Sequence, residues 1–356
     1  MFTRVVGVLS GIVLCAGCTS APQQALRKPL PPNWEMTPPE SPSPAKPAPT
    51  APPEAAARIP STPETGWVAV AEWCRTRGLI APQPLHPGGA ESFTLATPNG
   101  VWVLTAGSRI ARWDGLELHL GFAPWLLEGE LMLHALDLRK NLEPLLGGDG
   151  DRAGARGLIV LDPGHGGRNT GTRSVADGRW EKEFTLDWAQ RLAPLLAARG
   201  WRVLLTRTND ADLSLAERVA FAQRHRADLF VSLHFNAAGK GRSDEAGLET
   251  YCLTPTGMPS NLTRGFADEL VAVFPNNAWD ESNLRWAVRL HRALLTVNGG
   301  RDRGVRRARF PGVLRGQHCP AVLLEGGYLS NPEEAQKIGD PAYRQQLAEA
   351  LARALE

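Results

Sequence analysis

The chain has few cysteines, no marked excess of charge of either sign and no long hydrophobic run. Only five of its 356 residues are cysteine. Cys15 and Cys18 fall in the N-terminal leader, and the other three are far apart and form no Cys-x-x-Cys pair. This pattern argues against a disulfide framework and against a cysteine zinc site. Because 39 lysines and arginines face 37 acidic residues, no basic excess indicates nucleic acid as a partner.

Residues 1–18 form a leader without a membrane span. Arg4 precedes an apolar run from Val5 to Cys15, and small residues follow. This order is typical of a signal peptide. The run is too short to cross a bilayer comfortably. We therefore expect an exported protein.

The end of this leader, Leu14-Cys15-Ala16-Gly17-Cys18, resembles a bacterial lipobox. The resemblance implies that Cys18 is lipidated, becomes the mature N-terminus and attaches the protein to a membrane. The usual pattern has leucine where this chain has Cys15, so a plain signal peptide cut nearby is the alternative. Thr19 is not the aspartate associated with inner-membrane retention. The resemblance therefore favours an outer-membrane lipoprotein on the periplasmic side of the cell envelope.

Residues 19–65 are rich in proline, alanine and serine. Fourteen of the 29 prolines lie between Ala21 and Pro63. Such a composition cannot bury a core, and we expect a disordered, extended tether. At about 3.1 Å per residue it reaches roughly 130 Å at most, far enough to carry an anchored domain to a cell-wall layer.

Residues 66–150 alternate apolar and polar side chains. Pro98-Asn99-Gly100 and Trp113-Asp114-Gly115 are turn signals between short strands, and a short helix is expected near residues 133–146. We predict a small β-rich α+β domain. It is similar to the small stalk domains of cell-wall enzymes and copper amine oxidases. The resemblance implies wall binding, so that 66–150 alone would pellet with cell-wall sacculi; a module without special chemistry is the alternative.

Residues 151–356 follow a glycine-rich seam and alternate strands with helices. This alternation predicts an α/β sheet covered on both faces, with its chemistry at the strand ends. Strands are expected at 157–161, 201–206, 228–234, 247–253 and 321–325, and helices at 181–199, 214–225, 261–274, 282–297 and 342–355.

Three residues of this second domain are unusual for a purely structural role. His165 lies in a glycine-rich loop after the first strand, and His234 ends the apolar strand LFVSLH. Glu181 begins the buried stripe of its helix, whereas Glu183 lies about 200° further round and faces water. A lone carboxylate on a buried stripe is unfavourable unless it is paired or bound to a metal.

Two imidazoles and one carboxylate form a catalytic set for one Zn²⁺ that leaves a position for water. Glu325 ends the apolar strand AVLLE, just before Gly326-Gly327. A carboxylate there could take a proton from water and pass it to a leaving amine. From its position alone, a helix cap or a structural ion pair is an equal alternative for Glu325.

Four blocks in order resemble the zinc N-acetylmuramoyl-L-alanine amidases of the type 3 family, over roughly residues 157–356. The blocks are LDPGHGG, Glu181-Lys182, ADLFVSLHFNA and PAVLLEGGYLSNPEEA. The resemblance implies a twisted mixed sheet flanked by helices. It implies that His165, Glu181 and His234 bind zinc and that Glu325 is catalytic. It implies peptidoglycan as the substrate, cut between N-acetylmuramic acid and L-alanine. Asn236, beside His234, is a weaker expectation for contact with the substrate or a ligand.

The chain departs from this family in two places. Tyr328 stands where phenylalanine is more usual. Residues 255–282 are longer than a minimal connection, and in some relatives a segment in this area covers the active site until a protein activator moves it. We therefore hypothesise self-inhibition by this segment. A carboxypeptidase-like zinc hydrolase of stem peptides and a non-catalytic wall-binding lipoprotein are the rival interpretations.

Overall fold

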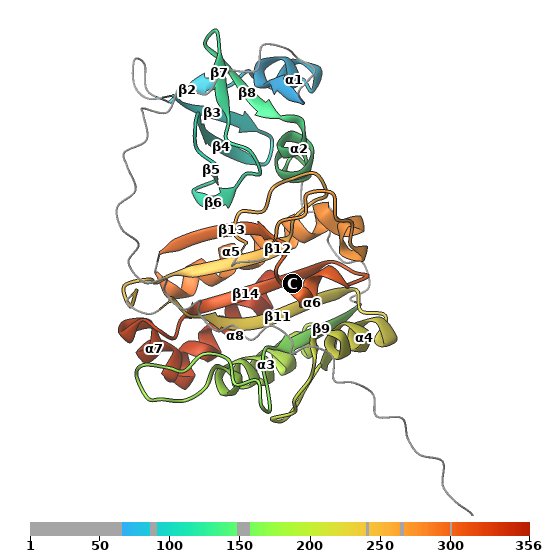
Figure 1. Cartoon of the computed structure of the whole chain (residues 1–356), viewed down its shortest axis with the longest axis vertical. Helices are drawn as coiled ribbons and strands as arrows, with labels where there is room; N and C mark the ends of the chain where they lie inside the picture. The colour runs from blue at the N-terminus through green and yellow to red at the C-terminus, as the bar shows by residue number, and fades with distance from the viewer. Residues whose placement is uncertain (1–65, 86–90, 148–156, 240–241, 264–266, 300) are drawn as a thin grey trace, which may run out of the picture. The chain divides into compact units, whose positions relative to one another are not determined.

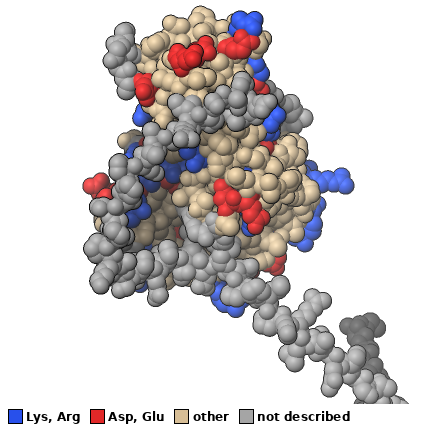
Figure 2. All heavy atoms as spheres, turned by 45° about the horizontal axis from the view of Figure 1, so that its top comes forward, with Lys and Arg blue, Asp and Glu red and all other residues tan. Residues whose placement is uncertain are grey.

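The computed structural model describes residues 66–85, 91–147, 157–239, 242–263, 267–299 and 301–356 (Figure 1). The leader, Cys18 and the tether expected in residues 1–65 lie outside the described residues. Among those described, no helix combines the length and the apolar character needed to cross a membrane. On the face drawn in Figure 2, neither basic nor acidic side chains cover the surface.

The first described region is rich in short strands. Its elements are β1 (Trp67–Ala69), α1 (Val70–Thr76), β2 (Gln83–Pro84), β3 (Ser92–Thr97), β4 (Gly100–Thr105), β5 (Ile110–Trp113), β6 (Leu116–His119), β7 (Trp125–Leu127) and β8 (Glu130–His134). Both turn signals join antiparallel neighbours, β3 to β4 and β5 to β6. At the second turn Asp114 and Gly115 have φ of 45° and 81°, as a tight two-residue hairpin requires. The expected short helix is divided into α2 (Ala135–Asp137), a π turn (η2, Leu138–Leu142) and a 3₁₀ turn (η3, Glu143–Leu145).

The second region is built on a mixed sheet. Its strands are β9 (Leu158–Pro163), β10 (Arg202–Leu205), β11 (Leu229–Asn236), β12 (Leu248–Leu253), β13 (Asp302–Ala308) and β14 (Ala321–Tyr328). Their order is β10-β9-β11-β14-β12-β13. Neighbours run parallel except β12 and β14, which are antiparallel. The expected mixed sheet is confirmed, and a pair between Val305 and Leu118 continues it into β6.

Helices cover both faces of this sheet (Figure 1). They are α3 (Glu181–Ala197), α4 (Leu215–His225), α5 (Asp280–Asn298), α6 (Gly312–Arg315), α7 (Pro332–Gly339) and α8 (Pro341–Ala354), with a 3₁₀ turn η4 (Pro275–Trp279). Successive strand residues alternate between two cores, because side chains alternate along a strand. Leu324 packs in the core with α3, α5 and α8, whereas Leu323 packs in the core with α4 and α6.

One expected helix, residues 261–274, is wrong. The described residues of that stretch contain no helix, and the next helical turn begins only at Pro275. Phe274 is extended, with φ −120° and ψ 154°, because a residue before proline is disfavoured in the helical region. Ser260 donates to Asp268 through both its backbone N–H and its hydroxyl. Side-chain contacts, and not a helix, therefore hold these described residues.

Candidate active site

His165 lies in the loop that follows β9, held by a buried arginine. Arg218 of α4 donates to the carbonyl of Pro163 at 2.9 Å and to that of His165 at 2.6 Å, and it pairs with Asp162 at 2.6 Å. His165 itself has φ of 63°, a conformation that is uncommon for a residue with a side chain and concentrates at functional sites. A Cβ added at Gly164 would strike the His234 ring, so glycine allows the two imidazoles to approach.

Glu181, the first residue of α3, is buried between these imidazoles. Its Oε1 lies 3.0 Å from Nε2 of His165 and 3.0 Å from Nδ1 of His234. The same oxygen accepts from the backbone N–H of Phe235. Glu183, by contrast, is exposed and accepts from the backbone N–H of Trp180. The helix phase therefore predicted correctly which carboxylate is buried.

The three side chains of His165, Glu181 and His234, here called the metal group, have the geometry and the donor atoms of a metal site. Their ligand atoms all lie within 4.8 Å of one another. Nδ1 of His165 donates to Oδ1 of Asn169 at 2.8 Å, so Nε2 is the ring nitrogen that faces Glu181. That Nε2 is buried and makes no hydrogen bond to any described residue, despite its closeness to Glu181. A histidine oriented through its other ring nitrogen is typical of a metal ligand.

The electrostatics of the group also suit a cation. Burial alone would raise the pKa of Glu181, but the two imidazoles outweigh it and lower that pKa, so the carboxylate is ionised. Burial lowers the pKa of His234 and keeps its ring neutral. Burial opposes protonation of His165 as well, but Glu181 outweighs it and raises the pKa of His165. Because metals bind carboxylate and neutral imidazole, a cation would take the place of a proton here.

Glu325 lies beside the metal group on the neighbouring strand. In β14 it is opposite His234 of β11 on one side and Glu249 of β12 on the other. Residues opposite one another point to the same face of a sheet, with strands about 4.8 Å apart. Glu325 is buried and is not one of the three grouped ligands, so it lies near the metal position without being needed to fill it.

Glu249 is a buried carboxylate that we did not single out from the sequence. It accepts hydrogen bonds from Asn236 Nδ2 at 2.8 Å, the Tyr251 hydroxyl at 2.5 Å and the Tyr328 hydroxyl at 3.2 Å. Arg303 pairs with it at 2.8 Å. The only sign of this network in the sequence is that Glu249 is an acidic residue within the otherwise uncharged strand LETYCL. Asn236 thus contacts Glu249, and its contact with a substrate stays a prediction.

The described residues of the segment 255–282 do not cover this site, which contradicts the cover on which the expected self-inhibition depends. Since β12 runs antiparallel to β14, it ends near the beginning of β14 and away from Glu325. Asn276 donates to the carbonyl of Cys319, just before β14. The segment therefore lies at the opposite ends of the strands from the metal group.

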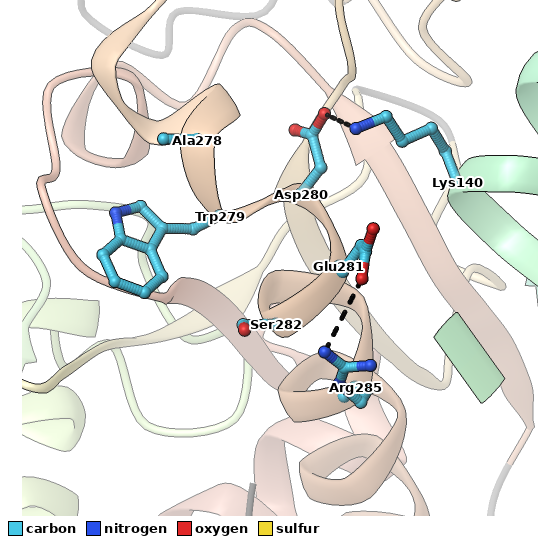
Figure 3. A pocket seen from close by; sticks show the side chains of 7 residues that line it. All are labelled: Lys140, Ala278, Trp279, Asp280, Glu281, Ser282 and Arg285. Atoms are coloured by element: carbon cyan, nitrogen blue, oxygen red, sulfur yellow. Dashed lines mark ion pairs between the residues drawn. The ribbon is translucent and has the colours of Figure 1, made fainter. Parts of the chain in front are cut away.

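A polar pocket of about 340 Å³ adjoins this segment (Figure 3). In it Lys140 points toward Asp280, at 3.1 Å, and Arg285 toward Glu281, at 3.8 Å. Ala278, Trp279 and Ser282 complete the lining. None of the candidate catalytic residues lines this pocket, so it is separate from the metal group.

Comparison with known proteins identifies the family of this chain. Residues 159–356, more than half of the chain, match the protein family described as N-acetylmuramoyl-L-alanine amidase. The chain belongs to this family. The chain is therefore an enzyme, an amide hydrolase of peptidoglycan, and all four residues of the candidate site fall within the matched range.

Two relatives and one solved structure are similar to this chain. The amidase AmiA of Salmonella typhimurium is 30% identical over 262 residues, which cover 66% of this chain and 88% of AmiA. The amidase CwlM of Bacillus licheniformis is 34% identical over 199 residues, 55% of this chain and 66% of CwlM. Among solved structures, the N-acetylmuramoyl-L-alanine amidase of Clostridium difficile 630 is 32% identical, covers 56% of this chain and 95% of its own, and has a TM-score of 0.47.

Proposed function

We propose that this amidase is a zinc enzyme in which His165, Glu181 and His234 hold one Zn²⁺ and Glu325 is the acid–base residue. Its reaction is hydrolysis of the amide that joins N-acetylmuramic acid to L-alanine. The observation that carries the proposal is the convergence of two imidazoles on the buried Glu181, with Nε2 of His165 buried and without a hydrogen bond to any described residue. When bound, zinc polarises the amide carbonyl and acidifies a water molecule.

The protein's own groups then have separate tasks. Asn169 fixes the ring orientation of His165, and Arg218 holds the backbone that carries it. Glu325, next to His234 on the same face, takes the proton of the attacking water and delivers it to the nitrogen of the departing L-alanine. Its location on a neighbouring strand, and not among the ligands, supports this role over that of a fourth ligand.

Paired glutamate variants test the metal set. Glu181→Gln should lose zinc, whereas Glu183→Gln should retain it, because only the former carboxylate is buried between the histidines. Zinc per chain is measured after dialysis. Equal zinc content in the two variants would contradict the proposed ligand.

A second pair tests the acid–base residue and the bond that is cut. Glu325→Gln should keep zinc and lose about 10²–10⁴-fold in activity, whereas Glu333→Gln, at an exposed position in α7, should be fully active. Mass spectrometry of digested muropeptides should show intact stem peptides freed from the sugar. Peptides shortened at their C-terminus would favour the carboxypeptidase-like rival. Lysis that survives excess chelator or Glu325→Gln would refute the zinc mechanism.

We further propose that the enzyme works at the cell envelope as an outer-membrane lipoprotein. Residues 1–18 act as the signal peptide, a lipid on Cys18 binds the membrane, and residues 19–65 tether a small domain (66–150) and the catalytic domain (151–356) near the peptidoglycan. Cys18→Ala should release the protein from membranes upon fractionation, and labelled fatty acid should no longer be incorporated. A membrane-bound variant would contradict the anchor.

A further inference from the structure

A row of polar side chains continues beyond the catalytic residues on the same face of the sheet. His234, Glu325 and Glu249 lie opposite one another on β11, β14 and β12. Tyr251, on the same face of β12 as Glu249, lies opposite Arg306 of β13. At about 4.8 Å per strand, β13 is about 10 Å beyond Glu325 on the side away from His234.

Two carboxylates hold the side chain of Arg303 in place beside this row. Its Nε pairs with Glu249 at 2.8 Å and its terminal nitrogen with Glu245 at 2.5 Å. Its guanidinium lies over the Tyr328 ring at 5.1 Å. The hydroxyl that distinguishes Tyr328 from the more usual phenylalanine donates to Glu249. Charge and hydrogen bonds therefore fully engage Arg303.

Arg306 is engaged much less. Its Nε donates to the backbone carbonyl of Arg303 at 3.0 Å, which fixes the plane of the guanidinium. Its nearest carboxylate oxygen, on Glu249, is 3.7 Å away. Within the described parts of the chain, its terminal nitrogens make no hydrogen bond, and the side chain is 17% exposed. A guanidinium fork held by its Nε is suited to receive a planar anion on its two terminal nitrogens.

The proposed reaction determines which part of the substrate passes Arg306. Glu325 protonates the leaving amine, so the nitrogen of L-alanine lies beside β14. The metal group lies toward β11, so we place the sugar side of the amide there and the peptide side toward β12 and β13. At roughly 3.3–3.6 Å per residue, two to three residues of peptide span the distance to β13.

We propose that Arg306, supported by Arg303 and Glu249, binds a free carboxylate of the stem peptide and makes the enzyme selective for peptides that carry it. The inference rests on the proposed function, because it uses Glu325 to orient the leaving peptide. A carboxylate is the anion a peptide offers, and it matches the guanidinium in shape and charge.

The test uses the zinc-loaded full chain and two muropeptides that differ only in whether the stem-peptide carboxylates are free or amidated. Wild type should prefer the free acid by about tenfold in kcat/KM. Arg306→Gln should reduce this ratio toward one, chiefly through KM for the free acid. Arg306→Lys, which keeps the charge and loses the fork, should fall between them, and it serves where Arg306→Gln fails to fold. Arg301→Gln, at an exposed arginine just before β13, should retain the wild-type ratio.

Equal cleavage of the two substrates by wild type would overturn the inference while leaving the amidase activity intact. A kcat/KM ratio that is unchanged in Arg306→Gln would also overturn it. An equal loss of this ratio in Arg301→Gln would do the same, because it would show that net charge alone sets the preference. Failure of wild type to free the peptide from either substrate would instead refute the proposed function, and the inference with it.

Discussion

Replacing Arg218 by methionine should destabilise the enzyme and loosen its metal site. Asp162 and Arg218 are only 1% and 3% exposed, and methionine would leave the carboxylate without its cation. Removing one partner of a buried pair costs about 3–5 kcal/mol. Hydroxyls of Thr206 and Ser232 still donate to Asp162, so we expect about 3 kcal/mol. For a domain of this size the melting temperature should fall by roughly 6–12 °C.

The same variant should also bind zinc more weakly. Arg218 donates to the carbonyl of His165, so its loss frees the backbone that presents this ligand, and an effect of about 10–100-fold is typical of such supporting contacts. Arg224→Met, at an exposed position on the same helix, is the control. Calorimetry and competition with a zinc chelator measure both effects. If the two variants melt and bind zinc alike, the buried ion pair does not support the site.

The pH dependence of the stability lost in Arg218→Met gives an independent check. Burial alone would raise the pKa of Asp162, but Arg218 and the hydroxyl donors outweigh it and lower that pKa. Ionised Asp162 therefore stabilises wild type above its unfolded-state pKa of about 3.9, and this stabilisation is lost as the pH falls through the lower folded-state pKa. Without Arg218 the pKa of Asp162 rises. The difference in melting temperature between Arg218→Met and wild type should shrink between pH 7 and 4, and a constant difference would contradict this explanation.

Further predictions concern the metal loop and the segment beyond β12. Gly171→Ala should reduce bound zinc, because its Cβ would lie 2.6 Å from Oε2 of Glu181; Gly107→Ala, also at positive φ but with open space around it, should leave zinc content unchanged. Deletion of residues 258–280 should not raise activity on sacculi, since the segment lies at the opposite strand ends; a rise would restore self-inhibition. Zinc at about 100 times its Kd should stabilise the fold by about 2.7 kcal/mol, measured as a higher melting temperature than in chelator.

The grouping of His165, Glu181 and His234 could be predicted from the sequence because each of them has a local signal. Helix phase distinguishes Glu181 from Glu183, and glycines mark the loop around His165. His234 ends an uninterrupted apolar strand. These signals are contained in single elements, and parallel strands bring their ends together at one edge of the sheet. The alternation of strands and helices in the sequence indicates parallel strands. In such a sheet the three residues, each at the end of a strand or the beginning of a helix, come close together.

The network around Glu249 could not be predicted in this way. Its partners come from four strands, β11 to β14. The pairing of β12 with β13 also shifts register at this position. Nor does local pattern show that Asp268 pairs with Arg309, at 2.5 Å. Both features depend on tertiary pairing between distant residues, which leaves little periodicity in the sequence.

The reversed direction of β12 is common to the two features that the sequence did not predict, the network around Glu249 and the segment after β12. In an all-parallel sheet the connection after β12 would leave at the same edge as His165 and His234, where it could cover the site. Because β12 runs antiparallel to β14, and β13 follows β12, this connection leaves at the other edge. The same reversal brings the beginnings of β12 and β13, with Glu249 and Arg303, beside the residues that end β11. One change of strand direction thus takes this connection away from the metal group and places beside it the acidic and basic side chains along which, in our proposal, the leaving peptide lies.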